Sequence, residues 1–365
     1  MHVAELRKKI DALDRRLVSL LNARARVAVR IGQLKQVSAV DVYVPAREKT
    51  VLAHVQRENH GPLGKEAMDS IYREIMSSTR SLERQVRVAH FGQATTFTHQ
   101  AARLRFGASV TYIPCETISD VFEKVRNGQA DHGVVPIENS TEGAVTYTLD
   151  EFAQTPLKIC AEIYLPISHH LMARHAPRVA ANPCRGIRQV VSHPQVLAQC
   201  RNWLHTEMPG VEIVPATSTA RAAEMAVQDR RVAAIGSILA AEHYHLQVLA
   251  AEIQDLSGNM TRFLVIGKSF GSPTGDDKTS IFFAVKHKAG TLHNALGALK
   301  KYRLNMTKIE SRPNKLKAWE YLFFVDIEGH VMEPRVHKAL RELERHCTLM
   351  TVLGAYPQAP EAAED

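Results

Sequence analysis

The N-terminal stretch carries the feature that most restricts the fold, an unbroken helical spacing of apolar residues. Steps of four and three residues separate Leu6, Ile10, Leu13, Leu17, Leu20, Arg24, Val27, Ile31 and Leu34. Because an α-helix repeats every ~3.6 residues, this spacing predicts one long helix with the narrow apolar stripe of a helix bundle. Arg24 interrupts the stripe. It could lie at the edge of an interface with its charge in water, but if it is buried it needs an anionic partner.

Two further cationic residues lie on the same predicted helix. Lys35 is nearly on the face of Arg24 and about 16 Å further along the axis, so both side chains could converge on one small anion. Arg7 lies about 25 Å from Arg24 and a quarter-turn around the helix. If Arg7 also binds a ligand, it must serve a second site that includes a partner subunit. The spacing therefore predicts a homodimer or a higher homo-oligomer.

Length and composition exclude several classes of protein. A chain of 365 residues predicts two or three domains, and 45% hydrophobic with 23% charged residues is ordinary for a globular protein. No apolar run approaches the ~20 residues that span a membrane, and the charged N-terminus does not look like a signal peptide. The five cysteines are scattered without a Cys-x-x-Cys pair, which favours reduced thiols and a cytoplasmic location.

The net charge of +8 and the missing motifs narrow the ligand classes. No Lys/Arg block is interleaved with aromatic residues, so we expect small dianionic substrates rather than nucleic acid or a membrane. Nucleotide-binding glycine motifs and a Gly-x-Ser-x-Gly motif are missing, which gives no support to a nucleotide enzyme or a serine hydrolase. The histidines at 169–170 and 243–245 lack a metal-ligand frame, and we expect neither a metal nor a cofactor.

Residues 86–268 alternate short apolar strands with helical patterns, which predicts parallel sheets covered by helices and ligands at the strand ends. Polar residues follow apolar strands directly in three places. These are Glu138, Asn139 and Ser140; Ser192 and His193; and Thr217, Ser218 and Thr219. Each segment also has a purely structural interpretation. Asn and Ser cap helices, a histidine can occupy a turn, and hydroxyls at a helix start can cap it while they bind a carboxylate.

A fourth polar segment, Thr261-Arg262-Phe263, leads into the apolar residues 264–266. On its own, a Thr-Arg pair before a strand is usually a turn residue followed by a solvated charge. A Gly/Pro/Asp-rich linker follows at 269–278. Beyond it, the pattern predicts strand 279–286, helix 291–301, strands 304–310 and 319–327, helix 335–345 and strand 348–354, which is the order of a ferredoxin-like α+β domain.

The N-terminal motifs resemble those of the all-helical chorismate mutases. The resemblance is carried by Leu-Arg-x-x-Ile-Asp-x-Leu-Asp at 6–14, by Arg24, by the Gly-x-x-Lys that ends at Lys35, and by Arg47-Glu48. It implies an intertwined helical dimer over residues 1–85 that rearranges chorismate to prephenate. The resemblance implies that Arg7 of the other chain, Arg24 and Arg47 bind the substrate, Lys35 binds the ether oxygen, Glu48 binds the ring hydroxyl, and Thr79 and Glu83 complete the site.

Two positions depart from that family. Val44 replaces an acidic residue of some relatives, and Glu83 stands where some have a glutamine that donates to the ether oxygen. A carboxylate cannot donate, so Glu83 must be protonated to help, and we expect burial beside the substrate charge to raise its pKa. The mutase rate should then fall as the pH rises.

The four polar segments of 86–268 together resemble the prephenate dehydratase domain, whose fold is two α/β lobes around a cleft, like the periplasmic binding proteins. Prephenate must lose its ring hydroxyl and a carboxylate to become phenylpyruvate, and hydroxide leaves poorly without a proton or a strong hydrogen bond. The resemblance puts Thr261 at the leaving hydroxyl, with the proton given by Thr261 or relayed from Glu138 or His193. The implied substrate-binding residues are Thr96, Phe97, Thr98, Glu138, Asn139, Ser140, Ser192, His193, Thr217, Ser218, Thr219, Arg262 and Phe263. Arg262 could either anchor the substrate or order the site.

One loop departs from the dehydratase pattern. The family usually reads Gly-Pro-x-Gly-Thr-Phe-Ser, whereas residues 92–98 read Gly-Gln-Ala-Thr-Thr-Phe-Thr. Thr95 replaces the second glycine, and a threonine disfavours a positive φ, so we expect the loop to differ in shape.

Residues 276–357 resemble an ACT domain, a regulatory ferredoxin-like fold. Glu310, Ser311, Arg312 and Pro313 match the phenylalanine-binding motif of the dehydratase family, with Gly290, Thr291 and Leu292 as the other wall. Without the resemblance, Glu310 and Arg312 would be read as an exposed ion pair. Such sites lie between two ACT domains, so the resemblance implies an oligomer and feedback inhibition by L-phenylalanine. Residues 358–365 are expected to be a disordered tail.

The three regions together resemble the bifunctional chorismate mutase–prephenate dehydratases. Two alternatives remain open from the sequence. One is a non-catalytic amino-acid-sensing regulator, which would not explain Arg24 and Lys35 on a helical core stripe. The other is a mutase whose dehydratase is impaired by the altered loop at 92–98.

Overall fold

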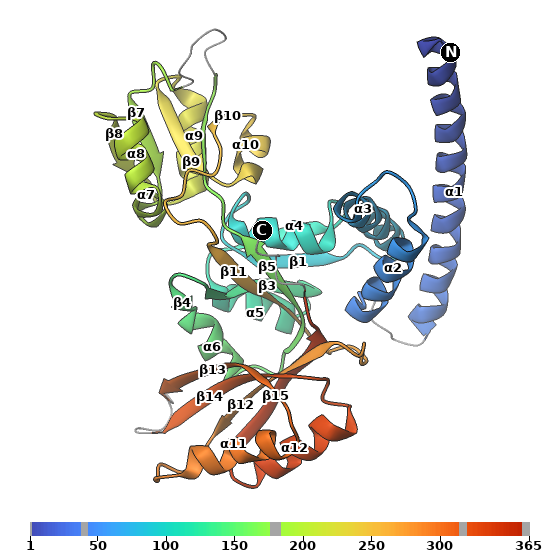
Figure 1. Cartoon of the computed structure of the whole chain (residues 1–365), viewed down its shortest axis with the longest axis vertical. Coiled ribbons are helices and arrows are strands. Elements are labelled where there is room, and N and C mark those ends of the chain that lie inside the picture. The colour runs from blue at the N-terminus through green and yellow to red at the C-terminus, as the bar shows by residue number, and fades with distance from the viewer. Residues whose placement is uncertain (1, 38–42, 176–183, 314–319, 360–365) are drawn as a thin grey trace.

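The computed structural model describes residues 2–37, 43–175, 184–313 and 320–359. Figure 1 shows a helical region at the N-terminus, a middle region with two sheets, and a C-terminal region in which two helices cover a sheet. None of the described helices is long and apolar enough to cross a membrane.

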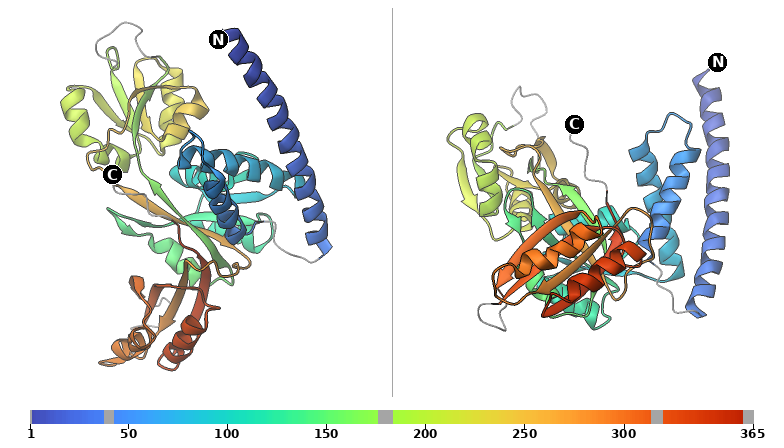
Figure 2. Two further views of the ribbon diagram at one scale, coloured as in Figure 1. Left: turned by 45° about the vertical axis from the view of Figure 1, so that its right-hand side comes forward. Right: turned by 60° about the horizontal axis from the view of Figure 1, so that its bottom comes forward.

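Three helices form the N-terminal region: α1 (Val3–Val37), α2 (Pro45–Glu58) and α3 (Lys65–Glu83). The single long α1 confirms the prediction from the apolar spacing. Gly32 lets α1 approach α3 closely, because a Cβ at this position would lie 2.7 Å from Cγ of Glu83. The N-terminal half of α1 extends past the other helices, and residues 2–20 are exposed (Figures 1 and 2). The apolar stripe of a single chain is therefore uncovered over much of its length.

The middle region contains two mixed sheets. The first runs β2 (Thr111–Cys115), β1 (Arg87–Phe91), β3 (His132–Asn139), β11 (Met260–Gly267) and β5 (Lys158–Pro166), with the short β4 (Gly143–Ala144) beside β3. The second runs β8 (Glu212–Pro215), β7 (Gln189–Ser192), β9 (Val232–Gly236), β6 (His170–Ala173) and β10 (Gln247–Ala250).

The prediction of parallel sheets holds for only part of each sheet. β1, β2 and β3 are parallel, as are β7, β8 and β9. By contrast, β11 is antiparallel to both β3 and β5, and β6 is antiparallel to β9 and β10. The chain returns from the second sheet along β11 and inserts between two strands of the first sheet, an arrangement that local sequence patterns do not encode.

Seven helices of the described middle region cover these sheets. They are α4 (Phe97–Phe106), α5 (Ile118–Arg126), α6 (Thr146–Phe152), α7 (Pro194–Gln199), α8 (Arg201–Glu207), α9 (Thr219–Gln228) and α10 (Ile238–Tyr244). The first sheet has an apolar core on each face. Phe263 and Val265 of β11 pack with α4, whereas Leu264 and Ile266 pack with α5, α6 and the C-terminal sheet.

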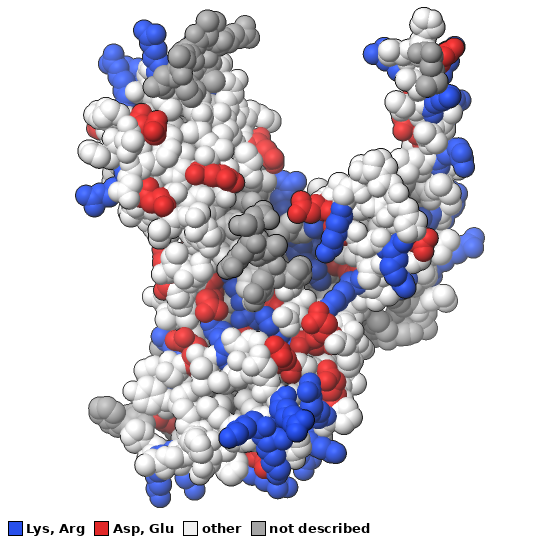
Figure 3. Space-filling view, viewed as in Figure 1, with Lys and Arg blue, Asp and Glu red and all other residues white. Residues whose placement is uncertain are grey.

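The C-terminal region follows the predicted order of elements. It consists of β12 (Asp277–Ala284), α11 (Thr291–Lys301), β13 (Met306–Pro313), β14 (Tyr321–Glu328), α12 (Pro334–Glu344) and β15 (Leu349–Pro357). The strands lie in the order β13-β14-β12-β15, and β15 joins β5 where Gly354 pairs with Ile159, so the two regions share one continuous sheet. Figure 3 shows Lys and Arg side chains gathered on the outer side of this region, where α12 carries the exposed Arg335, Lys338 and Arg341 and is followed by the exposed Arg345.

The predicted tail is partly ordered. The backbone N–H of Gln358 donates to the carbonyl of Asp276, and that of Ala359 donates to Oε1 of Glu162 at 3.0 Å. These bonds correct the prediction of disorder for the first two residues of 358–365. Residues 360–365 lie outside the described part of the chain.

Candidate active site

Thr261 lies inside strand β11 and pairs across the strands with Asn139, the last residue of β3. Nδ2 of Asn139 donates to Oγ1 of Thr261 and to Oδ1 of Asn259, both at 2.8 Å. Thr261 and Asn259 are both buried. Asn259 is not among the predicted site residues, although its position two residues before Thr261 places it on the same side of the chain.

The orientation of the Asn139 amide follows from its other bonds. Its Oδ1 accepts from the backbone N–H groups of Thr141 and Glu142 at 3.0 and 3.1 Å, and from the Thr141 hydroxyl at 2.6 Å. Backbone N–H groups can only donate, so the amide oxygen must face them and the NH2 group must face Thr261. Oγ1 of Thr261 is therefore an acceptor towards Asn139, which leaves its own hydrogen available for donation to a bound molecule.

A β-bulge decides which residues of β3 face Thr261. Arg262 pairs with Glu138, but the register shifts after Arg262 and leaves Ile137 as an extra residue. Consecutive residues of a strand face opposite sides of a sheet, and a bulge shifts this alternation by one residue. Asn139 thus faces Thr261, whereas Glu138 faces the opposite side of the sheet.

The partner of Glu138 confirms this orientation. Its Oε2 lies 2.6 Å from Nζ of Lys308 on β13, in the C-terminal region. The sequence-based prediction placed both Glu138 and Asn139 in the prephenate site. The structure corrects it for Glu138, because this carboxylate is paired on the back of the sheet and does not face the Thr261 hydroxyl.

Arg262 also faces away from Thr261. The guanidinium lies 2.6 Å from Oδ2 of Asp326 and 2.8 Å from Oε2 of Glu162, and it donates to the Tyr356 hydroxyl at 3.0 Å. Burial lowers the pKa of Arg262, but these partners outweigh burial and hold the pKa well above its usual value. These contacts correct the prediction that Arg262 binds the substrate, and they agree with the other role left open for it, that of ordering the site.

Within the loop at 92–98, Thr95 adopts the positive φ that a threonine was expected to disfavour. Thr95 adopts a φ of +76°, the conformation that a glycine at this position would favour. Its N–H donates to Nδ1 of His99 at 3.1 Å, and its carbonyl accepts from the Ser237 hydroxyl at 2.8 Å. Thr96 caps α4 by accepting from the N–H of His99, and the Phe97 ring lies 5.4 Å from the ring of His169.

Several other predicted site residues have structural roles. Ser192 is fully buried and donates to the carbonyl of Ile235 at 2.7 Å, while Ser218 caps α9. Ser140 accepts from the N–H of Met260 at 2.9 Å. These hydroxyls are engaged by the fold, which is the structural interpretation that the sequence left open. Phe263 and Thr98 are also buried, whereas His193 and Thr219 are half-buried and Thr217 is exposed.

Two side-chain contacts join the sheets near Thr261. Glu142 follows the Asn139 turn, and its carboxylate accepts from Nε2 of Gln195 at 2.5 Å and from Nε2 of Gln199 at 3.3 Å. Oε1 of Gln199 in turn lies 2.7 Å from Nε2 of His169. These glutamines were not predicted, although Gln195 directly follows the predicted segment that contains His193.

Comparison with known proteins decides the family. A family model of prephenate dehydratase matches residues 88–270, and one of type II chorismate mutase matches residues 6–84. The bifunctional chorismate mutase/prephenate dehydratase of Aquifex aeolicus is 48% identical over 97% of this chain and 98% of the relative, and that of Stutzerimonas stutzeri is 41% identical over 97% of each. The chain belongs to the bifunctional chorismate mutase/prephenate dehydratase family. It is thus an enzyme with both activities.

Solved structures match over the dehydratase and C-terminal regions. The prephenate dehydratase of Arthrobacter aurescens in complex with L-Phe is 35% identical and covers 75% of this chain and 90% of its own, with a TM-score of 0.67. A structure described as a quorum-quenching acylase, GqqA, is 28% identical over 75% of this chain with the same TM-score. The fold alone therefore does not fix the reaction, and the assignment of the two activities rests on the family models and the full-length relatives.

The mutase helices bring together only part of the predicted chorismate site. Nη1 of Arg24 donates to Oγ1 of Thr79 at 3.2 Å, and Glu83 packs on Gly32 of α1. Arg47 is exposed, and the exposed Arg7 lies on the uncovered half of α1. The side chain of Lys35 lies outside the described part of the chain.

Glu48 has partners that the sequence did not suggest. Its buried carboxylate forms an ion pair with Arg80 of α3 and lies 3.6 Å from Arg105 of α4, which belongs to the dehydratase region. Arg105 also donates to the Tyr43 hydroxyl at 2.5 Å. In this chain Glu48 therefore joins the mutase helices to the dehydratase, and its contact with the ring hydroxyl of chorismate stays a prediction.

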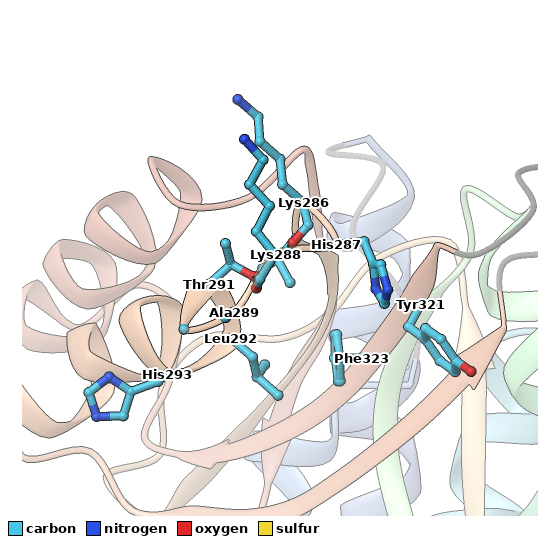
Figure 4. A pocket seen from close by; sticks show the side chains of 11 residues that line it. Lys286, His287, Lys288, Ala289, Thr291, Leu292, His293, Tyr321 and Phe323 are labelled. Carbon is cyan, nitrogen blue, oxygen red and sulfur yellow. Dashed lines mark hydrogen bonds between the residues drawn. The ribbon is translucent and has the colours of Figure 1, made fainter.

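The C-terminal region contains a pocket of about 460 Å³ whose lining includes Gly290, Thr291 and Leu292, the three residues predicted to form one wall of a phenylalanine site. Figure 4 shows Leu292 of α11 across the pocket from Phe323 and Tyr321 of β14. Ser311 and Pro313 pair with these two aromatic residues, which puts them on the same face of the sheet.

The other half of the predicted phenylalanine motif faces away from this pocket. Glu310 and Arg312 alternate with Ser311 and Pro313 along β13, and Arg312 lies 3.2 Å from Asp150 of α6. The structure thus splits the motif between the two faces of the sheet, with Arg312 at the contact between the C-terminal and dehydratase regions.

Proposed function

We propose that Thr261 and Asn139 form the centre of the dehydratase reaction. The observation that carries the proposal is the fixed Asn139 amide, which makes Thr261 Oγ1 an acceptor and directs its hydrogen towards a bound molecule. A hydrogen bond from Thr261 to the ring hydroxyl of prephenate would stabilise the developing hydroxide as the carboxylate leaves as carbon dioxide. Phe97, His193, Thr217 and Thr219 remain the proposed wall of the prephenate site, in a domain of residues 86–268 with two lobes like those of periplasmic binding proteins.

The test of this centre uses the two activities of one chain. Thr261→Val keeps the shape of the side chain but removes the hydroxyl, and we expect dehydratase kcat to fall by about 100-fold or more. Chorismate mutase activity in the same preparation should be unchanged, which controls for folding. Thr206→Val, at an exposed position of α8, should change neither activity. A Thr261→Val enzyme with normal phenylpyruvate production would refute the assignment.

We infer that the mutase region, residues 1–85, works as a homodimer with sites shared between chains. The exposed Leu6, Ile10, Leu13, Leu17 and Leu20 support this inference, because each leaves 42–66% of its surface in water in a single chain. Covering such a stripe favours association through the hydrophobic effect. Arg7 of one chain would then complete the site of Arg24, Lys35, Arg47, Thr79 and Glu83 on the other.

Complementation tests the shared site. Arg7→Ala and Lys35→Ala chains should each lack mutase activity, but a refolded mixture should recover about a quarter of it, because half of the dimers are mixed and each has one intact site. An inactive mixture that nevertheless contains dimers would contradict the arrangement.

We propose that residues 276–357 form an ACT domain through which L-phenylalanine inhibits the dehydratase. The pocket beside Gly290, Thr291 and Leu292 supports the proposal, as does the position of β13, the outermost strand of its sheet in the described residues, where a second copy could pair. The amino-acid-sensing regulator without catalysis is disfavoured by the family assignment.

The test is the addition of excess L-phenylalanine to the purified enzyme. It should lower the dehydratase turnover of the wild type, whereas the turnover of Leu292→Asp should not change. Equal activity of the wild type with and without phenylalanine would rule out this regulation.

A further inference from the structure

We propose that Lys308 and Asp326, both in the C-terminal region, are positioning residues for prephenate dehydration. They form ion pairs with Glu138 and Arg262, which lie next to Asn139 and Thr261 in the chain and face the opposite side of the sheet. These ion pairs fix the two strands that carry Thr261 and Asn139. The inference rests on the proposed role of Thr261 and Asn139.

The register of β3 and β11 determines which residues face the C-terminal region. Thr261 pairs with Asn139, and one step along the strands Arg262 pairs with Glu138. Because neighbouring residues face opposite sides, the first pair faces the reaction side and the second faces the C-terminal region. The bulge follows directly after Arg262 and Glu138, and there the strands lose regular ladder pairing. Side-chain contacts on the back face can therefore fix a part of the backbone that the ladder holds less firmly.

Each member of the back-face pair is bound by a different strand of the C-terminal region. Glu138 lies 2.6 Å from Lys308 of β13, whose side chain is only 11% exposed, and Arg262 lies 2.6 Å from Asp326 of β14. The charges alternate, so each contact is attractive. Because β13 and β14 pair with each other, the two contacts act together as one clamp on Glu138 and Arg262.

The Arg262 end of the clamp is set in a buried network. Oδ1 of Asp326 accepts from the Ser280 hydroxyl at 2.5 Å, while Glu162 binds both Arg262 and Lys278, the latter at 3.1 Å. Two cations thus face two carboxylates with little water nearby, and removal of one partner leaves an uncompensated charge. A displaced Arg262 would carry the adjacent Thr261 with it, since the two share a peptide bond.

The proposed contacts would make dehydratase turnover sensitive to the position of the C-terminal region. Strand β13 carries Lys308 two residues before Glu310, so a shift of this strand acts on Glu138 directly. A movement of β13 therefore reaches the strand that carries Asn139 through one direct contact, without intermediate residues.

The experiment compares dehydratase and mutase kcat in each preparation, so that a folding defect is recognised by loss of both. Lys308→Met keeps length but removes the charge, and we expect the dehydratase-to-mutase ratio to fall about 10- to 100-fold, mainly in kcat rather than KM, because misplacement of reacting groups has effects of this size. Asp326→Asn should act in the same direction. Lys300→Met, an exposed lysine of the same region, is the matched control and should have no effect.

Charge exchange separates positioning from general stability. Glu138→Lys and Lys308→Glu should each lower the ratio, and the double variant should recover to within about threefold of wild type, because the attractive pair is rebuilt. A normal ratio in Lys308→Met, or a double variant no better than either single variant, would overturn the inference. Thr261→Val, assayed in parallel, distinguishes the two proposals. If Thr261→Val lacks dehydratase activity while Lys308→Met has a normal ratio, only the positioning role of Lys308 and Asp326 is refuted. If Thr261→Val keeps dehydratase activity, the proposed reaction centre itself is refuted.

Discussion

Gly354 offers the sharpest test of how the C-terminal region is joined to the dehydratase. A Cβ at this position would lie 2.8 Å from both the carbonyl carbon and the Cβ of Ile159 on β5, and closer still to the carbonyl oxygen. These are mainly backbone atoms of a neighbouring strand, so they cannot rotate away. In Gly354→Ala, β15 must therefore move away from β5, and Tyr356, two residues further along, must move relative to Arg262.

The size of the effect follows from these contacts. Overpacking costs about 1–3 kcal/mol, and loss of the single bridge between β15 and β5 costs about 1 kcal/mol. The sum, about 2–4 kcal/mol, corresponds to a fall of roughly 5–15 °C in the midpoint of thermal inactivation of the dehydratase. Gly354 is not among the residues proposed to bind chorismate, so we expect mutase activity at 25 °C to be normal.

The control is Gly297→Ala in helix α11, where an added Cβ would meet nothing within 4 Å. Alanine is the better helix former, so this change should stabilise the region by about 0.5–1 kcal/mol. Thermal inactivation followed by phenylpyruvate formation measures both variants. A Gly354→Ala enzyme with the wild-type midpoint would show that β15 and β5 are not in the close contact described here.

Three further predictions concern the loop at 92–98, two histidines and the mutase. Thr95→Gly should leave dehydratase kcat within about twofold of wild type, because Thr95 already has the φ that a glycine would favour. Thr95→Pro imposes a φ near −65° and removes the N–H, so it should lower kcat by at least about 10-fold. Equal kinetics of the two variants would contradict this prediction. Burial lowers the pKa of His90 and of His99 to about 4, below the unfolded value of about 6.5. The unfolded chain thus binds more protons than the folded chain between pH 4 and pH 6.5. The contribution of the two histidines to the free energy of unfolding should therefore be complete above pH ~6.5 and decrease towards pH 4. The urea midpoint should decrease less steeply with falling pH in His99→Asn, and the same pH dependence as in the wild type would contradict the assignment. The mutase kcat of the wild type should fall as the pH rises, whereas that of Glu83→Gln should not depend on pH. The same pH dependence of kcat in both enzymes would show that Glu83 need not be protonated.

Much of the fold could be predicted from sequence because it depends on local patterns. The four- and three-residue steps from Leu6 to Leu34 produce α1, and the alternation of apolar residues with turns produces the C-terminal order of strands and helices. These signals act over one or two turns of chain, where side-chain spacing alone decides which face is apolar. The position of Asn139 beside Thr261 was also predictable, because both polar segments were expected at strand ends and the two residues pair across neighbouring strands of one sheet.

The direction of individual side chains could not be predicted in the same way. Ile137 looks like any apolar strand residue, and only its pairing with β11 makes it the extra residue of a bulge that turns Asn139 to the reaction side and Glu138 to the back. Glu48, likewise, lies on a helix whose neighbours include Arg105, more than fifty residues away in sequence. Local sequence thus determined the elements and the candidate chemistry of this protein. The tertiary structure decided which polar groups face substrate and which bind one another, because strand register and domain contacts bring together charges that are distant in the chain.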